Sequence, residues 1–270
     1  MEKVKIVKIG GNIVDNPQAL EQFLGNFHKL EGPKVLIHGG GKIASQLSKE
    51  LGIEVKMHNG RRITDYETLK LVTMVYAGLI NKQIVAALQQ IGCKAVGLSG
   101  ADGNSVPAVK RAANPIDWGF VGDVNPADIN ADFLQLLLEG GYIPVFCAIT
   151  HDSNGSLLNT NADTMASSLA RALSGRFQTS LVYCFEKDGV LANPDDDSSV
   201  IPLITRESYR DLLEKGMIVG GMIPKLDNAF AALENGVAGD YICYPADDEN
   251  DIYLVKKEVF ENTYVRGDEA

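Results

Sequence analysis

Short apolar runs alternate with long amphipathic stretches along most of this chain, and this alternation restricts the folds that it can adopt. Strands joined by helices pair in parallel, and a parallel sheet is covered by helices on both faces. The predicted strands are Val4–Ile9, Val35–His38, Ala95–Ser99, Ile143–Ile149, Leu181–Phe185 and Tyr241–Tyr244. The predicted helices are Pro17–Leu30, Ile43–Leu51, Tyr66–Ile91, Pro126–Glu139, Ala162–Leu173, Arg206–Lys215 and Pro224–Glu234. We therefore expect an α/β fold with an open, mainly parallel central sheet and helices on both faces.

The boundaries of these helices carry residues that commonly begin and end helices. Four polar residues are placed to accept hydrogen bonds from the free N–H groups of a first turn: Asp65, Asn125, Asn161 and Thr205. Glycines, which favour a left-handed helix end, follow the predicted helices at Gly52, Gly92, Gly140, Gly175, Gly216 and Gly236. One stretch, Gly100–Val124, breaks the alternation. It is rich in Gly and Pro with short strand-like pieces, which predicts a hairpin on the edge of the sheet.

Composition and charge argue against several classes of partner. The net charge is −10 and no basic stripe is present, so we expect no nucleic acid partner. No apolar run approaches the ~20 residues of a membrane span, and the chain enters a strand-like pattern at once, without a cleavable signal. The cysteines are far apart and form no CxxC pair, as in reduced cytosolic proteins: Cys93, Cys147, Cys184 and Cys243. We therefore expect a cytoplasmic protein without a membrane partner.

Two glycine-rich turns follow the first two predicted strands. Gly10 and Gly11 come after Lys8, and Gly39–Gly41 precede Lys42. Ligands of open α/β sheets bind outside the carboxyl ends of the strands, so we expect both turns to face one crevice. Glycine lets backbone N–H groups approach an anion, and a following helix N-terminus adds a favourable dipole. A single turn of this kind is more often only a tight connection, but two turns with a strand-end lysine favour a phosphate site.

A competing interpretation comes from the stretch Gly39–Ala44, which fits the GxGxxG/A fingerprint of dinucleotide-binding proteins. That fingerprint is normally followed, about 20 residues later, by an acidic residue at the end of the next strand. Here the region reads HNGRRITD, with Arg61 and Arg62 in that place. A nicotinamide-dependent oxidoreductase is therefore a distant alternative. The Walker pattern GxxxxGK[ST] is absent because Ile43 follows Lys42, so a kinase with this sequence would not use a P-loop.

Polar residues also open helices that are predicted further along the chain. In the segment LLNTNAD, Asn161 is expected to cap the helix, which leaves Asn159 and Asp163 available to point into the crevice. Lys225 follows a Gly-Gly pair at a helix start, much as Lys8 precedes one at a strand end. A lone lysine at such a place is commonly surface decoration. Two lysines in matching positions suggest a shared anion.

Phosphorylation of a carboxylate is a reaction that suits these residues. The nucleophile is already an anion, so catalysis requires positioning and stabilisation of negative charge on the transferred phosphoryl group. We expect Lys8 and Lys225 to clamp that group and Asp163 to hold both ammonium groups between them. The donor would be ATP, with Mg²⁺ held mainly by the β- and γ-phosphate oxygens of the nucleotide and no separate metal site in the protein.

Seven segments, taken in order, resemble the amino acid kinase family over essentially the whole chain: KIGGN, IHGGGK, NGRRITD, GFVGDV, LLNTNAD, KDGVL and GGMIPK. The resemblance implies ATP-dependent phosphorylation of the γ-carboxylate of N-acetyl-L-glutamate, which gives an acyl phosphate in arginine biosynthesis. It also implies that Lys8 and Lys225 stabilise the transition state and that Asp163 organises them.

The resemblance assigns binding residues as well. Phosphate contacts are expected from Gly10, Gly11 and Gly39. Acceptor contacts are expected from Gly40, Gly41, Arg62 and Asn159, the last two on the α-carboxylate. Nucleotide contacts are expected from Glu186, Lys187, Asp188, Gly189, Val190, Leu191, Met217, Ile218 and Val219.

The resemblance further implies an acceptor lobe over residues 1–175 and a nucleotide lobe over residues 176–270, with one continuous sheet. The hairpin Gly100–Val124 would be a lid over the acceptor, and the helix Tyr66–Ile91 would form a homodimer. One departure concerns Arg61, which stands where Leu or Met usually precedes the substrate arginine. A guanidinium at the acyl end of the site would match the second carboxylate of N-succinyl-L-glutamate, whereas an Arg61 turned to solvent leaves the acetyl compound as the acceptor. A non-catalytic amino-acid sensor is a further alternative, although it would not need both lysines and the aspartate.

Overall fold

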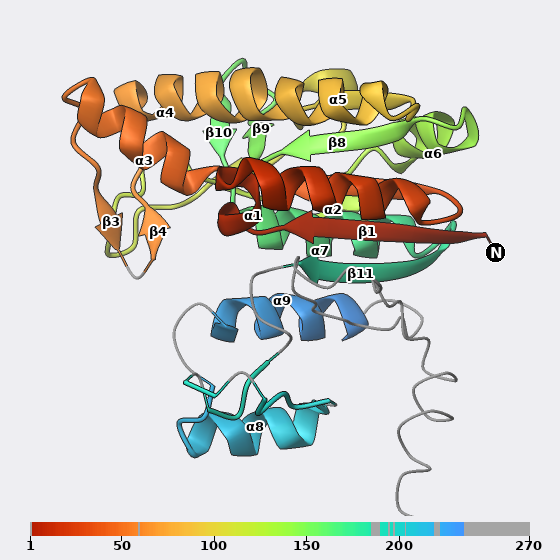
Figure 1. The fold of residues 1–270 in the computed structure, drawn as a ribbon. Helices are drawn as coiled ribbons and strands as arrows, with labels where there is room; N and C mark the ends of the chain where they lie inside the picture. The colour runs from red at the N-terminus through yellow and green to blue at the C-terminus, as the bar shows by residue number, and fades with distance from the viewer. Residues whose placement is uncertain are drawn as a thin grey trace, which may run out of the picture.

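A five-stranded parallel sheet lies at the centre of the computed structural model, which describes residues 2–58, 60–184, 190–193, 195–196, 198–202, 204–218 and 222–234. Its strands, in the order β11-β1-β2-β8-β5, are β1 (Lys3–Ile9), β2 (Lys34–His38), β5 (Ala95–Leu98), β8 (Ile143–Cys147) and β11 (Gln178–Cys184). All neighbouring pairs are parallel. Helices cover both faces of the sheet (Figure 1). The predicted α/β fold is therefore confirmed.

Most helices of the described residues begin and end close to the predicted positions, whereas α1 was not predicted and α6 begins five residues later than expected. They are α1 (Gly11–Asp15), α2 (Pro17–Lys29), α3 (Gly41–Glu50), α4 (Tyr66–Thr73), α5 (Asn81–Gln90), α6 (Ala131–Glu139), α7 (Ala162–Leu173), α8 (Arg206–Glu214) and α9 (Met222–Glu234). The predicted caps Asp65, Asn161 and Thr205 each accept a hydrogen bond from a backbone N–H in the first turn of their helix. Asn125 instead caps a short 3-10 turn, Pro126–Asp128, because the extended residue Ile129 separates that turn from α6.

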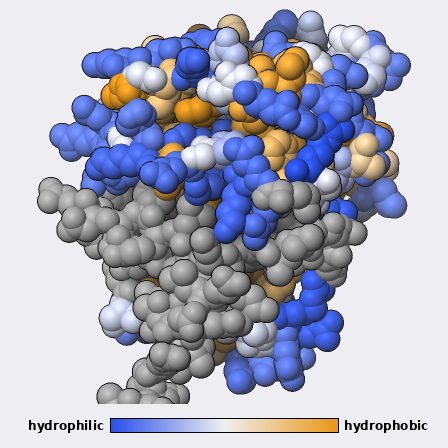
Figure 2. Space-filling view, turned by 90° about the vertical axis from the view of Figure 1, so that its right-hand side faces the viewer, coloured by the Kyte–Doolittle hydropathy of each residue, from blue (hydrophilic) through white to orange (hydrophobic). Residues whose placement is uncertain are grey.

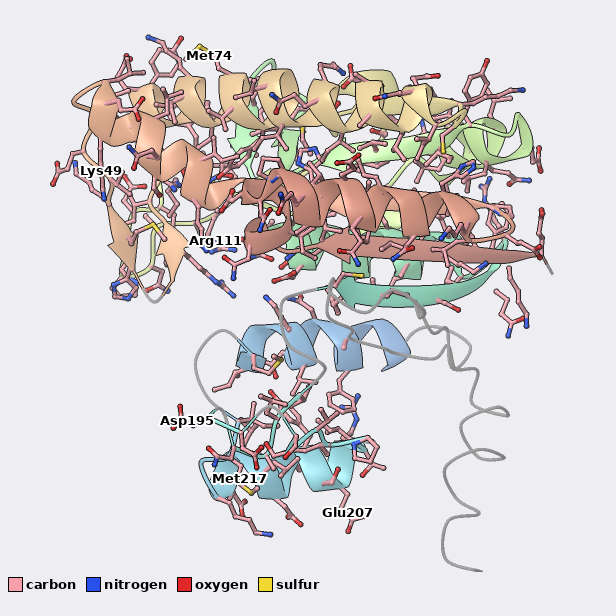
Figure 3. All side chains as sticks on the ribbon, viewed as in Figure 1. Lys49, Met74, Arg111, Asp195, Glu207 and Met217 are labelled. Carbon is pink, nitrogen blue, oxygen red and sulfur yellow. The ribbon has the colours of Figure 1, made fainter. Side chains whose placement is uncertain are left out.

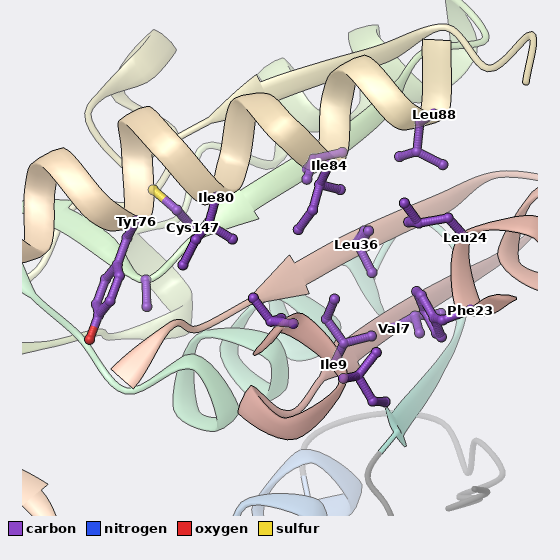
Figure 4. Close-up of a cluster of buried hydrophobic side chains, with 14 of the residues drawn as sticks. Val7, Ile9, Phe23, Leu24, Leu36, Tyr76, Ile80, Ile84, Leu88 and Cys147 are labelled. Carbon is purple, nitrogen blue, oxygen red and sulfur yellow. The ribbon is translucent and has the colours of Figure 1, made fainter. Parts of the chain in front are cut away.

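Alternation along β1 decides which side chains meet which helix layer. Val7 and Ile9 pack in one buried cluster with residues of α2 and of the long helix Tyr66–Gln90, which consists of α4, a π-helical segment and α5 (Figure 4). Val4 and Ile6 belong to a second buried cluster that includes residues of α6 and α7. Since successive side chains of a strand point to opposite faces, Lys8 shares the face of Val4 and Ile6. The strand-end lysine is therefore directed to the layer that contains α7.

Two predicted elements differ in detail from the structure. The predicted strand Ile143–Ile149 is two strands, because after Cys147 the chain leaves the sheet and β9 (Ile149–His151) pairs antiparallel with β10 (Leu157–Asn159). The predicted hairpin is present as β6 (Val109–Lys110) and β7 (Gly122–Asp123). It forms a separate two-stranded sheet and bridges to His151 and Asn159, rather than extending the edge of the central sheet.

The predicted helix Tyr66–Ile91 is continuous, but a π-helical segment, Met74–Ile80, joins α4 to α5. By length and composition alone, Tyr66–Gln90 could span a membrane, which differs from the expectation that no apolar run approaches that length. However, 44% of its most apolar window is buried inside the protein. The helix crosses one face of the sheet in Figure 1, and this packing accounts for its apolar side.

The last third of the chain starts in the same sheet, because β11 pairs along its whole length with β1. Beyond it, Val190, Tyr209 and Ile218 form a small buried cluster of their own. The predicted strand Tyr241–Tyr244 lies outside the described residues, and the division into two lobes near residue 175 stays a prediction. Among the residues that are coloured in Figure 2, most are hydrophilic, and a group of apolar residues lies in the upper part of the view.

Candidate active site

Lys8, near the carboxyl end of β1, forms an ion pair with Asp163 in the first turn of α7. Its Nζ lies 2.7 Å from Oδ1 of Asp163, and both side chains are largely buried. Two contacts fix the first turn of α7. Asn161 accepts a hydrogen bond from the N–H of Thr164 at 2.9 Å, and the hydroxyl of Tyr183 on β11 donates to the carbonyl of Asp163 at 3.1 Å. The carboxylate therefore has a defined place beside the strand-end lysine.

Lys225 reaches the same carboxylate from α9. Its Nζ donates to Oδ2 of Asp163 at 3.1 Å, so each carboxylate oxygen faces one ammonium group. Burial alone would raise the pKa of Asp163, but the charges of Lys8 and Lys225 outweigh it and hold that pKa below its ordinary value. Two lysines that are far apart in sequence are thus held around one ionised carboxylate. This arrangement of positive charge suits a group that carries several negative oxygens.

The glycine turns lie next to Lys8, Lys225 and the Asp163 carboxylate between them, which we call the clamp. The N–H of Gly10 donates to the carbonyl of Cys184 at 2.9 Å, which leads the chain from β1 into α1 at Gly11. A Cβ atom on Gly39 would lie 3.9 Å from the Cβ of Ala162, the residue directly before Asp163. The predicted phosphate-binding residues and the clamp therefore meet at the carboxyl ends of β1 and β2, as the rule for open α/β sheets predicts.

Gly40 is a position at which only glycine fits. Its φ of 155° is rare for other residues, and a Cβ atom there would lie 2.3 Å from Cδ1 of Ile80. Gly41 begins α3, so the free N–H groups of that helix start at this turn. The turn is thus packed tightly on the side of the long helix.

Arg62 joins the turn to the predicted acceptor site. It lies on β4 (Arg61–Arg62), which pairs with β3 (Met57–His58), and its Nη2 donates to the carbonyl of Gly41 at 3.0 Å and to Oγ of Ser45 at 2.7 Å. Its Nη1 is buried and donates no hydrogen bond within the described part of the chain. The Arg62 side chain also interacts with the nearby hydroxyl of Tyr76. A buried guanidinium with an unbonded nitrogen beside this turn fits a site that receives a carboxylate.

Asn159 is brought to the same region by the β9–β10 hairpin. Its Nδ2 donates to Oγ1 of Thr64 at 3.0 Å, although the two residues are far apart in sequence. Thr64 follows Arg62 by two residues and donates to the carbonyl of Arg62 at 3.3 Å. The two residues predicted to hold the α-carboxylate are therefore linked through one buried threonine.

Arg61 behaves differently from its neighbour. It is exposed, whereas Arg62 is buried, because consecutive residues of a strand point to opposite faces. The arrangement of β4 therefore favours the interpretation in which Arg61 is turned to solvent.

The predicted nucleotide residues are described only in part. Val190 and Ile218 are buried in one cluster, Leu191 is also buried, and Met217 is half-buried near the end of α8 (Figure 3). The two predicted nucleotide segments therefore meet in space. Outside the described residues lie Glu186, Lys187, Asp188, Gly189 and Val219.

Several contacts of the site could not be inferred from sequence motifs. Ser45 and Thr64 hold Arg62 and Asn159 through hydroxyl groups, and Tyr183 anchors Asp163. The one sequence signal for these contacts is that Thr64 lies two residues after Arg62, which was predicted to bind the acceptor. Within the described residues, no group of three or more His, Cys, Asp or Glu side chains is placed to hold a metal ion.

Comparison with known proteins places these features in a family. A model of the amino acid kinase family matches residues 3–243. A protein of Cytophaga hutchinsonii named acetylglutamate kinase is 55% identical over 244 residues, which is 90% of this chain and 92% of that protein. A protein of the same name from Phocaeicola vulgatus is 54% identical over 237 residues, covering 88% and 91% of the two chains. A crystal structure from Streptococcus mutans superposes with a TM-score of 0.72 at 27% identity, covering 93% of this chain and 96% of that one.

Proposed function

The chain belongs to the amino acid kinase family, and we propose that it transfers the γ-phosphoryl group of ATP to the γ-carboxylate of N-acetyl-L-glutamate. The observation that carries this proposal is the position of Asp163 between Lys8 and Lys225, at 2.7 and 3.1 Å. The curated relatives that share over half of their aligned residues with this chain are named for the same acceptor. The family match leaves no support for a nicotinamide-dependent oxidoreductase, and the intact clamp argues against a sensor without activity.

The reaction follows from the charges of the site. An oxygen of the γ-carboxylate attacks the γ-phosphorus, a P–O bond forms, and the bond from that phosphorus to the departing ADP breaks. No proton has to be removed from the nucleophile, so Asp163 is not required as a base. Lys8 and Lys225 stabilise the negative oxygens of the moving phosphoryl group, and Asp163 keeps both ammonium groups charged and in place. Mg²⁺ bound to the nucleotide would shield its β- and γ-phosphate oxygens.

Arg62 would bind the α-carboxylate of the acceptor through its buried Nη1, and Asn159 would contribute through the amide that Thr64 orients. The exposure of Arg61 favours N-acetyl-L-glutamate over N-succinyl-L-glutamate, because an outward guanidinium offers no partner for a second carboxylate. Gly10, Gly11 and Gly39 would contact phosphate, and Gly40 and Gly41 would contact the acceptor. Val190, Leu191, Met217 and Ile218 would contribute to the nucleotide site.

We also propose that the protein is a cytoplasmic homodimer. The long helix presents Tyr66, Met74 and Leu79 to the outside, each about half exposed, and Figure 3 shows Met74 pointing away from the sheet. Exposed apolar side chains on one helix are suited to packing against a second copy. Cys93, Cys147 and Cys184 are buried and not in disulfides, which agrees with a reducing compartment.

Trapping of the acyl phosphate tests the proposed reaction. Hydroxylamine converts an acyl phosphate to a hydroxamate, which is measured in parallel with ADP. We expect hydroxamate and ADP in equal amounts with N-acetyl-L-glutamate and Mg-ATP. ADP release that does not depend on any acylglutamate, or release without hydroxamate, would contradict the proposal.

A further inference from the structure

His38 is a buried titratable residue that the proposed chemistry does not use. It ends β2 directly before the Gly39–Gly41 turn, and its side chain is not exposed at all. Its Nδ1 lies 2.8 Å from the carbonyl oxygen of Gly39. A carbonyl oxygen can only accept, so Nδ1 carries the hydrogen and Nε2 is an acceptor in the neutral ring. Burial lowers the pKa of His38 to about 4, so the ring is neutral near pH 7.

Asn81 fixes this tautomer from the start of α5. Its Nδ2 lies 3.1 Å from Nε2 of His38 and donates to the carbonyl of Val145 at 2.8 Å, while its Oδ1 accepts from Lys82 at 3.0 Å. The side chain is only 1% exposed. Every polar atom of the amide therefore has a partner, and the amide nitrogen can serve His38 only as a donor.

The π-helical segment brings Asn81 to this place. The backbone N–H of Asn81 bonds the carbonyls of Gly78 and Tyr76. Tyr76 lies five residues earlier, one more than the acceptor in an α-helix. Tyr76 and Ile80 of the same segment pack against Gly40, and both are visible beside Cys147 in Figure 4. Space for the amide is left by Gly97 on β5, where a Cβ atom would lie 2.0 Å from Oδ1 of Asn81. The long helix thus holds the glycine turn by both packing and hydrogen bonds.

The hydrogen bond from His38 holds the carbonyl of Gly39, and this carbonyl determines the direction of the N–H of Gly40. The Gly39–Gly40 peptide is planar and trans, so the N–H of Gly40 points away from the carbonyl of Gly39. His38 lies on the sheet face toward the long helix, because it follows Leu36 by two residues and contacts Asn81. Lys8 shares the opposite face with Val4 and Ile6 and contacts Asp163 of α7. The N–H of Gly40 is therefore directed toward the side of the clamp.

Resting on the function proposed above, we propose that His38 and Asn81 are positioning residues that aim the N–H of Gly40 at the phosphoryl group in transfer. This contact adds to the acceptor contact proposed for Gly40. The ring does not exchange a proton with the substrate, and it acts only through the peptide that it holds. A buried histidine that merely fills the core would contribute to stability without this effect on turnover.

Two substitutions distinguish the hydrogen bond of Nδ1 from that of Nε2, because each keeps only one of them. In asparagine the amide nitrogen is joined to Cβ through one carbon, as Nδ1 is, so His38→Asn can keep the bond to Gly39. In glutamine the amide is one carbon longer and reaches the position of Nε2, so His38→Gln keeps the bond to Asn81 and loses the bond to Gly39. The test compares kcat, the KM values for ATP and for the acceptor, and the thermal midpoint of each variant.

We expect kcat of His38→Gln to fall by about 10-fold or more below that of His38→Asn, with both KM values within about threefold of wild type. Equal kcat values in two folded variants would overturn the proposal. Gly97→Ala is the second variant, because its added Cβ would displace the amide of Asn81 without changing a residue of the site. It should lower kcat relative to wild type, as His38→Gln does. If it folds and turns over like wild type, the proposed role of Asn81 is wrong.

The same variants remain informative if the proposed function fails. A wild-type protein that forms no acyl phosphate from any acylglutamate would reject the function, but not the positioning of the turn. The affinity for Mg-AMP-PNP then decides, because weaker binding by His38→Gln than by His38→Asn supports the network and equal binding contradicts it. A wild-type protein that binds no nucleotide would reject both.

Discussion

Lys8 and Tyr183 are directly paired on the neighbouring parallel strands β1 and β11, and both reach Asp163. Lys8 contacts the carboxylate, whereas the hydroxyl of Tyr183 donates to the main-chain carbonyl of the same residue. The register of the sheet therefore sets the distance between the strand-end lysine and the first turn of α7. Asp163 is therefore attached to the sheet through both its side chain and its backbone.

Removal of the Tyr183 hydroxyl tests this attachment. We expect Tyr183→Phe to lower the free energy of unfolding by about 1 kcal/mol, because one buried hydrogen bond is lost. We also expect a several-fold decrease in kcat, since Asp163 is held less firmly. Tyr142→Phe is the control, because Tyr142 is 45% exposed and directly precedes β8, at the end of the sheet opposite to the clamp. Urea unfolding and kcat of both variants would show whether only the first affects turnover, and equal kcat values would exclude the attachment.

Arg62 and Arg61 form a second matched pair. Arg62→Ala should raise the KM for the acceptor by about 10-fold or more, because the variant loses a charge-assisted hydrogen bond to the α-carboxylate. Its effect on the KM for ATP should be small. Arg61→Ala should leave both KM values within about twofold, since an exposed charge at that place has no substrate partner. A response confined to the KM for ATP would reverse the assignment of Arg62.

The acyl group of the acceptor depends on the direction of Arg61. We expect wild type to prefer N-acetyl-L-glutamate to N-succinyl-L-glutamate, and Arg61→Leu to leave the ratio of the two kcat/KM values unchanged within about threefold. The measurement is a steady-state comparison of the two acceptors on both proteins. A preference for the succinyl compound that the substitution reverses about tenfold would show that Arg61 binds the second carboxylate.

Stability should depend on pH through His38. The pKa of this ring is about 4 in the folded protein, below the ordinary value of 6.5. The unfolded chain therefore binds the proton more readily. The contribution of His38 to the free energy of unfolding is fully present above about pH 6.5 and is lost as the pH decreases toward 4. From pH 7 to pH 5 we expect a loss of about 2 kcal/mol in wild type that His38→Asn lacks. Urea unfolding at the two pH values measures this difference, and equal losses in both proteins would contradict a buried neutral ring.

Much of the fold could be predicted because local patterns and tertiary packing agree. The apolar runs around Val7 and Leu36 are buried strands, and the capping residues Asp65, Asn161 and Thr205 begin the helices that they were expected to begin. Lys8 and Asp163 could be paired in advance, because both occur where a sheet of this class binds its ligands. Their contact at 2.7 Å agrees with that expectation.

Other features depend on contacts between distant parts of the chain, which leave little trace in a local pattern. The run Ile143–Ile149 is uniformly apolar, so its division after Cys147 became visible only through the pairing of β9 with β10. The π-helical turn before Asn81 was not predicted, and the bonds of Asn81 to His38 and Val145 join it to distant strands, which a local pattern does not show. The different environments of Arg61 and Arg62 follow from a two-residue strand that was too short to predict.

The central claim is that Lys8 and Lys225, held by Asp163, stabilise the phosphoryl group in transfer. Lys5→Ala is a suitable control, because Lys5 lies on the same strand but its ammonium donates to the carbonyl of Glu31. Circular dichroism and the thermal midpoint establish that each variant is folded.

The most direct measurement is kcat for Lys8→Ala, Lys225→Ala and Asp163→Ala at saturating Mg-ATP and N-acetyl-L-glutamate. We predict that each folded variant loses a factor of about 10² or more, whereas Lys5→Ala stays within about twofold of wild type. Turnover close to that of wild type in all three clamp variants would contradict the account.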